Sequence, residues 1–157
     1  MIDKQLFRRL TKLPVMTVFM LVCLMYGIDL TGLGYRIAFA NQLAISLMVF
    51  MSGLAIIATG GYIFRKANTT LNPTKPEYTS YLVTGGIYRI SRNPMYVGFL
   101  LWLVACVVYI GNMINLLLLP VFIVLINRWF IVPEEKALAS LFGEEFSEYK
   151  NKVRRWL

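Results

Sequence analysis

Two polar segments flank a long apolar stretch in the second half of the chain, and their residue types could bind a charged ligand. The first, residues 82–96 (LVTGGIYRISRNPMY), combines glycines, arginines and an asparagine. The second begins with Pro133, Glu134 and Glu135. The apolar stretch between them contains a single cation, Arg128. If this stretch folds back on itself, the two polar segments meet at one end and form a site.

Each residue type in these segments has a chemical use and also a plainer explanation. The Thr84-Gly85-Gly86 turn exposes backbone N–H groups, and glycine lets a ligand approach the main chain closely. Tyrosines such as Tyr88 and Tyr96 are also common anchors at a membrane surface. Arginines also contact lipid phosphates, and glutamates in a first helical turn also complement the helix dipole. These plain explanations account for each feature alone. They account less well for a Gly-Gly turn, an Arg-Asn-Pro-x-Tyr motif and an acidic pair occurring together, and this combination favours a binding site.

The composition indicates a single membrane domain. Hydrophobic residues make up 58% of the 157 residues and charged residues 15%, and the mean hydropathy is +0.63. These values lie far from those of soluble globular domains. The two cysteines, Cys23 and Cys106, lie in apolar runs, and the chain has no histidine. A disulfide framework, a Cys/His zinc site and a histidine base are therefore excluded.

The apolar runs predict an all-α integral membrane protein with four transmembrane helices. These spans are residues 14–30, 42–64, 96–110 and 114–131. Gly111 and Asn112 give the turn signal between the last two spans, which we interpret as a tight antiparallel hairpin. Small residues in the second span predict close helix contact. They are Ser46, Ser52, Gly53, Ala55, Ala58, Gly60 and Gly61.

The tail, residues 133–156, is predicted to form a helix that lies at the membrane surface. Glu134 and Glu135 fall in its first turn, where acidic groups suit the dipole, so capping and ligand binding both remain open for them. Apolar residues recur at helical spacing and predict one apolar face. They are Leu138, Leu141, Phe142, Phe146, Tyr149 and Val153.

The distribution of positive charge predicts the orientation of the chain. Of the 16 lysines and arginines, all except Arg36 fall in the N-terminal segment, the loop between the second and third spans, or the end of the fourth span and the tail. The positive-inside rule then places both termini and the 65–94 loop in the cytoplasm. Anionic lipid headgroups account for the net charge of +8 without any nucleic-acid partner.

The two polar segments carry a family resemblance. The motifs LVTGGIY at 82–88, RNPMY at 92–96, Glu134-Glu135 and FGEEFSEY at 142–149 resemble the C-terminal half of the isoprenylcysteine carboxyl methyltransferases, which are related to the membrane phospholipid methyltransferases. The resemblance covers residues 68–157, so we interpret residues 1–67 as a two-span part and residues 68–157 as the catalytic part. The eukaryotic pattern has histidine where this chain has Asn93. Asparagine hydrogen-bonds but does not titrate near neutrality, so a role in binding is expected.

The resemblance implies a methyltransferase that uses S-adenosylmethionine and has its pocket on the cytoplasmic side. The candidate cofactor-binding residues are Ser80, Tyr81, Leu82, Val83, Thr84, Gly86, Tyr88, Arg92, Asn93, Pro94, Met95, Tyr96, Glu134 and Glu135. No residue is required as a catalytic base, and no metal site is expected. Arg128 has two interpretations: an anchor to lipid phosphate, or a group that orients an anionic acceptor.

The acceptor and the exact activity stay open at this point. A prenylcysteine carboxylate, a phospholipid amine and a small hydrophobic thiol or acid all fit a lipidic acceptor that enters from the bilayer. Two other functions compete: an NADPH-dependent reductase of the membrane sterol type, and a helical membrane protein without catalysis. The chain shows no targeting extension, which favours a prokaryotic cytoplasmic membrane, and its oligomeric state is not predicted.

Overall fold

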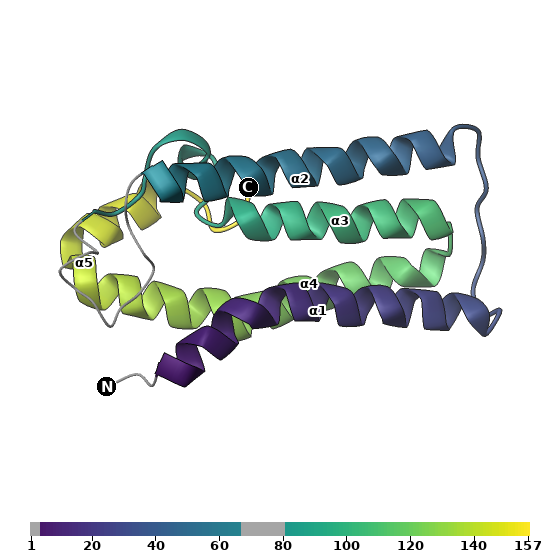
Figure 1. Ribbon diagram of the computed structural model, residues 1–157, viewed down its shortest axis with the longest axis horizontal. Helices are drawn as coiled ribbons and strands as arrows, with labels where there is room; N and C mark the ends of the chain where they lie inside the picture. Colours follow the sequence, from purple (N-terminus) through teal and green to yellow (C-terminus); the bar gives the residue numbers. More distant parts are fainter. Residues whose placement is uncertain (1–3, 67–80) are drawn as a thin grey trace.

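The computed structural model describes residues 4–66 and 81–157, and it is helical throughout most of this length (Figure 1). The α-helices are α1 Lys4–Leu30, α2 Gln42–Lys66, α3 Pro94–Ile110, α4 Leu118–Ile126 and α5 Val132–Lys152. Two short 3-10 helices, η2 Gly86–Arg89 and η3 Met113–Leu117, precede α3 and α4, and a π-helical turn, η4 Asn127–Ile131, joins α4 to α5. Within the described residues there is no strand, only an isolated bridge between Arg36 and Asn112.

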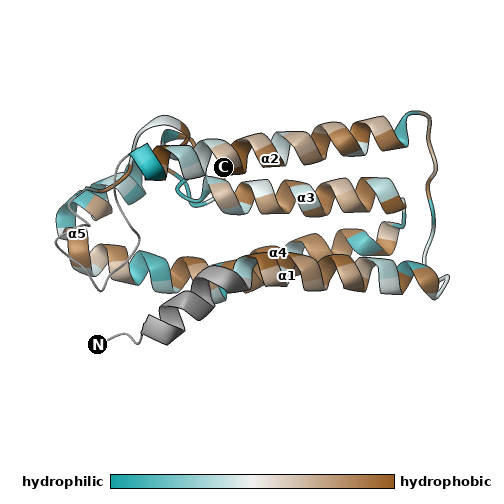
Figure 2. Ribbon diagram, in the orientation of Figure 1, coloured by the Kyte–Doolittle hydropathy of each residue, from teal (hydrophilic) through white to brown (hydrophobic). Residues whose placement is uncertain are grey.

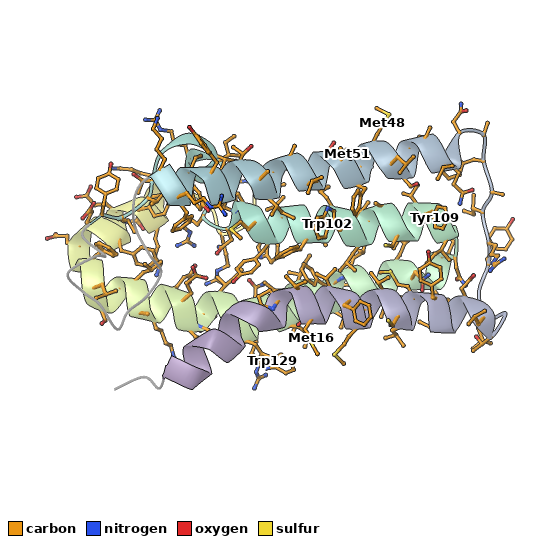
Figure 3. All side chains as sticks on the ribbon, in the orientation of Figure 1. Met16, Met48, Met51, Trp102, Tyr109 and Trp129 are labelled. Atoms are coloured by element: carbon orange, nitrogen blue, oxygen red, sulfur yellow. The ribbon has the colours of Figure 1, made fainter. Side chains whose placement is uncertain are left out.

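The helices have the length and composition of a membrane bundle. Two helical runs, α2 and the continuous run Met113–Lys152, are long and apolar enough to cross a bilayer, while Pro14–Leu30 and Pro94–Ile110 are shorter apolar helices. Large apolar side chains such as Met16, Met48 and Trp129 point away from the bundle and are more than half exposed (Figure 3). Such a surface is expected where lipid, not water, surrounds the helices.

The main core lies between α1, α3 and the run from α4 to η4. Met25, Leu103, Phe122 and Ile126 are completely buried in it. The α1 members recur every three or four residues and the α3 and α4 members every four, as expected for one stripe on each helix. The remaining buried members are Val18, Leu21, Phe99, Val107, Leu118, Phe130 and Ile131.

α2 packs on α3 with very close backbone contact. A Cβ atom added at Gly98 would lie 2.7 Å from the carbonyl oxygen of Gly53, and one added at Gly53 would lie 2.7 Å from that of Gly98. Ser46, Gly53 and Gly60 are the buried residues of α2 and are spaced by seven, so they form one stripe toward α3. Of the predicted small residues, Ser52, Ala55 and Ala58 are exposed instead.

The connections 31–41 and 111–112 lie together at one end of the bundle (Figure 1). The N–H of Ile37 donates to the Gly111 carbonyl at 2.9 Å, and that of Met113 donates to the Tyr35 carbonyl at 3.0 Å. Gly111 ends α3 with a positive φ of 73°, as the predicted hairpin turn requires. Buried Asn112 donates to the Leu33 carbonyl at 2.8 Å.

The opposite end of the bundle is more polar (Figure 2). The start of α1, the end of α2, the loop before α3, α5 and the C-terminus all lie toward this end (Figure 1). The predicted antiparallel hairpin is therefore present, and it places the start of α3 beside the end of η4. Tyr96 contacts Phe130 there, with ring centroids 6.4 Å apart.

The tail is helical, as predicted, but its helix is kinked and ends at Lys152. α5 continues directly from α4 through the π-turn, a wider turn that accommodates Pro133, which has no N–H to donate. Gly143 then breaks the helical geometry with a φ of 51°, so the second half of α5 changes direction. Leu141 is exposed and does not join the buried cluster that the other members of the predicted apolar face form.

Candidate active site

The loop that enters α3 forms one wall of the site. Tyr81–Thr84 have no regular secondary structure. Ser80 lies outside the described residues. Leu82 and Val83 are buried, and Gly86 has a φ of 59°, which a side chain would strain. The 3-10 turn that follows buries Tyr88.

α5 covers this loop with its apolar face. Leu82, Phe146 and Tyr149 form a buried cluster, with Leu138, Phe142 and Val153 packed around it. The hydroxyl of Tyr149 donates to the Tyr88 carbonyl at 2.6 Å. The face predicted to lie on the membrane is thus used inside the protein, where it fixes the loop. An amphipathic pattern predicts that one face of a helix is covered, but it does not say whether lipid or another part of the chain covers it. Here the loop covers it.

Glu134 points into the site with little compensation for its charge. The Tyr96 hydroxyl donates to it at 3.5 Å, the one hydrogen bond of this carboxylate to a side chain of residues 14–66 or 81–157. Burial raises the pKa of Glu134 to about 7, although the Tyr96 hydrogen bond acts in the opposite direction. Burial and the nearby Glu134 charge also raise the pKa of Tyr88 above its usual value. A carboxylate held this way is suited to an ammonium or hydroxyl donor.

Glu135 has different surroundings from its neighbour. The guanidinium of Arg155 donates to both of its oxygens, from Nε at 3.1 Å and from Nη2 at 2.6 Å. Nη2 of Arg92 lies 3.2 Å from the same carboxylate. Glu135 is therefore neutralised by two arginines, whereas Glu134 remains available.

Arg92 has unused hydrogen-bonding capacity. Its side chain is 11% exposed, and its Nε and Nη1 are buried without a hydrogen-bond partner among the described residues. Native proteins rarely leave buried donors unpaired, and an absent ligand is one explanation for such a group. Arg92 can donate hydrogen bonds to an anionic group from these two nitrogens.

Residues 153–157, here called the C-terminal clasp, leave α5 and return to the loop. The Arg154 carbonyl accepts from the Arg92 N–H at 3.0 Å. The Arg155 carbonyl accepts from the Ser91 hydroxyl at 3.3 Å and from Asn93 Nδ2 at 3.0 Å. Because a backbone carbonyl only accepts, the amide nitrogen of Asn93 must face the clasp. Trp156 secures the other end by donating to Asn127 Oδ1 at 3.1 Å.

The structure brings most of the predicted residues together but not all of them. Tyr88, Pro94 and Met95 lie against Gly60 of α2, and Tyr96 lies against Glu134. Arg128, by contrast, is exposed in the π-turn with no ion pair to a described residue. Tyr81 is also exposed.

Sequence reasoning missed the clasp and its contacts. Ser91, Asn127, Arg155 and Trp156 were not predicted as members of the site. Arg154 and Arg155 fall within the helix predicted over residues 133–156, but the helix ends at Lys152. In the sequence Glu135 has no cation one helical turn away, which indicates a partner that is distant in the chain. Several arginines could have been that partner, so the sequence did not identify it.

Residues 41–145 match the family model for phospholipid methyltransferases. This stretch includes α2, the loop, the hairpin and most of α5. The chain belongs to the phospholipid methyltransferase family. The match begins earlier than residue 68, where the resemblance was expected to begin, so α2 is part of the shared region.

Several relatives belong to the isoprenylcysteine methyltransferases, as the motifs indicated. The protein-S-isoprenylcysteine O-methyltransferase of Schizosaccharomyces pombe is 38% identical over 72 residues, 46% of this chain and 30% of that protein. Protein-S-isoprenylcysteine O-methyltransferase B of Arabidopsis thaliana is 36% identical over 102 residues, 63% of this chain and 48% of that protein. An uncharacterized protein of Haemophilus influenzae is 46% identical over 63 residues, 40% of this chain and all of that protein.

The chain thus spans about a third to a half of the curated methyltransferases it matches. No solved structure matches it.

Proposed function

We propose that this phospholipid methyltransferase family member is an S-adenosylmethionine-dependent methyltransferase of the membrane, with its donor site at the polar end of the bundle. The observation that carries the proposal is the pair of unsatisfied, oppositely charged groups in that site. Among the residues whose side chains the structure describes, Glu134 is a desolvated carboxylate without a cation, and Arg92 has two buried N–H groups without an acceptor.

The residues fit the donor's polar groups. S-adenosylmethionine carries an α-carboxylate, an α-ammonium group and ribose hydroxyls. Arg92 suits the carboxylate, while Glu134 suits the ammonium group or a hydroxyl. The aromatic rings of Tyr88 and Phe64 contact edge to face, at 5.1 Å between centroids, and line the α2 side of the loop. Aromatic faces of this kind can stack on a base.

When bound, S-adenosylmethionine supplies a methyl group activated by its sulfonium. The chain's own contribution is then to hold donor and acceptor in line and to exclude water. A carboxylate acceptor is already charged and needs no base. An amine acceptor must lose a proton, and Glu134, with a pKa of about 7, is suited to receive it.

We propose a lipidic acceptor that reaches the site from the bilayer. The apolar exteriors of α1, α2 and α4 support this route, since the site lies at the end of a bundle with lipid-type surfaces. The named activity of several relatives, on isoprenylcysteine, supports a hydrophobic acceptor with an anionic end. Arg128, which is exposed in the π-turn, would meet such a charge at the membrane boundary.

Equilibrium binding to the purified protein in detergent tests the proposal. S-adenosylmethionine should bind, and NADPH should not. Methyl transfer from labelled donor to extracted lipids and to a prenylcysteine then identifies the acceptor class. Binding of NADPH in place of S-adenosylmethionine would assign the chain to the reductase alternative, and binding of neither would favour a protein without catalysis.

A further inference from the structure

Arg155 and Arg92 both contact the carboxylate of Glu135. Arg155 takes both oxygens of Glu135, at 3.1 and 2.6 Å. Arg92 approaches the same group with Nη2 alone, at 3.2 Å. The two remaining polar edges of Arg92, at Nε and Nη1, are left buried and unpaired. Arg155 therefore determines how Arg92 can be used.

The Arg155–Glu135 pair has the features of a strong interaction. It is bidentate, which fixes the orientation of both groups. Glu135 is 13% exposed and Arg155 36% exposed, so solvent screens the pair less than a surface pair. The hydrogen bond to Glu135 also raises the pKa of Arg155. By comparison, Lys152 meets Glu148 at 3.2 Å through a single contact, with side chains 73% and 66% exposed.

The backbone of the clasp holds Arg155 in place. Its own carbonyl is bound by Ser91 and Asn93, and the preceding carbonyl is bound by the N–H of Arg92. The Trp156 ring packs on Phe122 of the main core, at 6.5 Å between centroids. The guanidinium thus projects from an anchored segment toward Glu135. The clasp lies beyond residues 41–145, the part that matches the family model.

We propose that Arg155 is a positioning residue of the donor site. By occupying both oxygens of Glu135, it prevents Arg92 from closing onto that carboxylate and keeps Nε and Nη1 of Arg92 free for the donor's carboxylate. This inference rests on the proposed function. Without Arg155, Arg92 forms the bidentate pair with Glu135, which takes one of its two free nitrogens and leaves a single one for the ligand.

The test compares two donor molecules across matched variants. In Arg155→Ala, the dissociation constant for S-adenosylmethionine should rise about tenfold, as for one lost charged hydrogen bond. Decarboxylated S-adenosylmethionine, which has no group for Arg92, should bind the variant and the wild type alike. Lys152→Ala removes a cation and an ion pair from the same tail and should change neither affinity.

A second substitution separates positioning from simple loss of structure. Adding Glu135→Gln to Arg155→Ala removes the charge that captures Arg92, so S-adenosylmethionine affinity should recover toward the wild-type value. If Arg155→Ala does not fold, Arg155→Lys replaces it, because lysine keeps the charge but not the bidentate contact. The same two donors are then compared, and the loss of S-adenosylmethionine affinity should be smaller.

Equal weakening for both donors, or no recovery in the double variant, would overturn the role of Arg155. A wild-type protein that does not bind S-adenosylmethionine at all would instead overturn the proposed function.

Discussion

The two adjacent glutamates at the start of α5 show how position separates residues of one type. A helix turns by about 100° per residue, so neighbours face different directions. Glu134 faces Tyr96 and the interior of the site, while Glu135 faces the clasp and Arg92. The dipole at the helix start favours both charges equally. Within the described part of the chain, what distinguishes them is that two arginines contact Glu135 and none contacts Glu134.

Glu134 should make donor binding depend on pH. In the folded protein its pKa is about 7, against 4.5 for an ordinary glutamate. Between these values the folded state binds more protons than the unfolded state, so the free energy of unfolding falls as the pH rises from about 4.5 to 7. A donor that needs the ionised carboxylate should bind more tightly over the same rise and level off above it.

Glu134→Gln should remove both pH dependences and weaken donor binding by about 1.5–3 kcal/mol at pH 8, the range for charged hydrogen bonds. Titration of the donor and thermal unfolding between pH 5 and 8 measure the two effects. Glu148→Gln, at an exposed glutamate of the same helix, is the control and should alter neither. A donor affinity that Glu134→Gln leaves unchanged would exclude Glu134 from the site.

Asn93 should act through its hydrogen bond to the Arg155 carbonyl. Asn93→Ala leaves that carbonyl without its amide donor and loosens the clasp, so donor affinity should fall by about 1–3 kcal/mol. Asn93→His should keep much of the activity, because one imidazole N–H can donate to the same carbonyl. The rates of both variants, measured against pH, check this. A much faster histidine variant with a new transition near the imidazole pKa of about 6.5 would show a base role instead.

At the scale of helices, the contact between α2 and α3 positions the end of α2 against the loop and the start of α3, which belong to the site. In a lipid environment such contacts depend on packing and small residues, because the hydrophobic effect does not favour one apolar neighbour over another. Gly53 and Gly98 bring the two backbones together, and Trp102 ties them by donating to the Phe50 carbonyl at 3.2 Å. Farther along, Gly60 lies against Met95 and Tyr88 of the site.

Gly98→Ala and Gly53→Ala should each destabilise the protein by about 1–3 kcal/mol, because the added methyl group meets a backbone carbonyl that cannot move aside. Unfolding of the purified protein in mixed detergent measures the change. Gly61→Ala, also in α2 but with no atom within 4 Å of the added Cβ, is the control and should be neutral or mildly stabilising because alanine favours helix. A loss in Gly61→Ala equal to the other two would show that the close contact is not the cause.

The elements that the sequence predicted well are those whose evidence is local. Apolar length gave the four helical segments, and Gly111 with Asn112 gave the hairpin that brings Tyr96 to Glu134. The tail was predicted less well because its partners are distant. The clasp is held largely by backbone carbonyls, which every residue has, so no pattern of side chains indicates it. The break at Gly143 resembled an ordinary helical glycine, and the π-turn has no sequence signature beyond Pro133.

For the whole molecule, the two ends of the bundle differ in charge and in the means by which they are held. At one end Arg36, the one cation predicted there, forms a two-point ion pair with Asp29. This pair offsets its positive charge. At the other end Arg65, Lys66, Arg89 and Arg128 are exposed, along with cations of α5. This asymmetry supports the orientation proposed from the sequence, because exposed cations favour the cytoplasmic surface and its anionic lipids.

Reporter fusions should therefore divide between the two ends. Fusions at Leu157 and within residues 71–77 should both report the cytoplasm, because the clasp lies at the same end of the bundle as the end of α2 and residues 81–93, between which residues 71–77 fall in the sequence. A fusion at Gly34, in the connection between α1 and α2, should report the opposite compartment. Alkaline phosphatase and green fluorescent protein fusions give opposite signals and serve as mutual controls. A cytoplasmic Gly34 would contradict the four-span arrangement, since α1 would then fail to cross the bilayer, while an external Leu157 would move the donor site away from the cytoplasmic supply of S-adenosylmethionine.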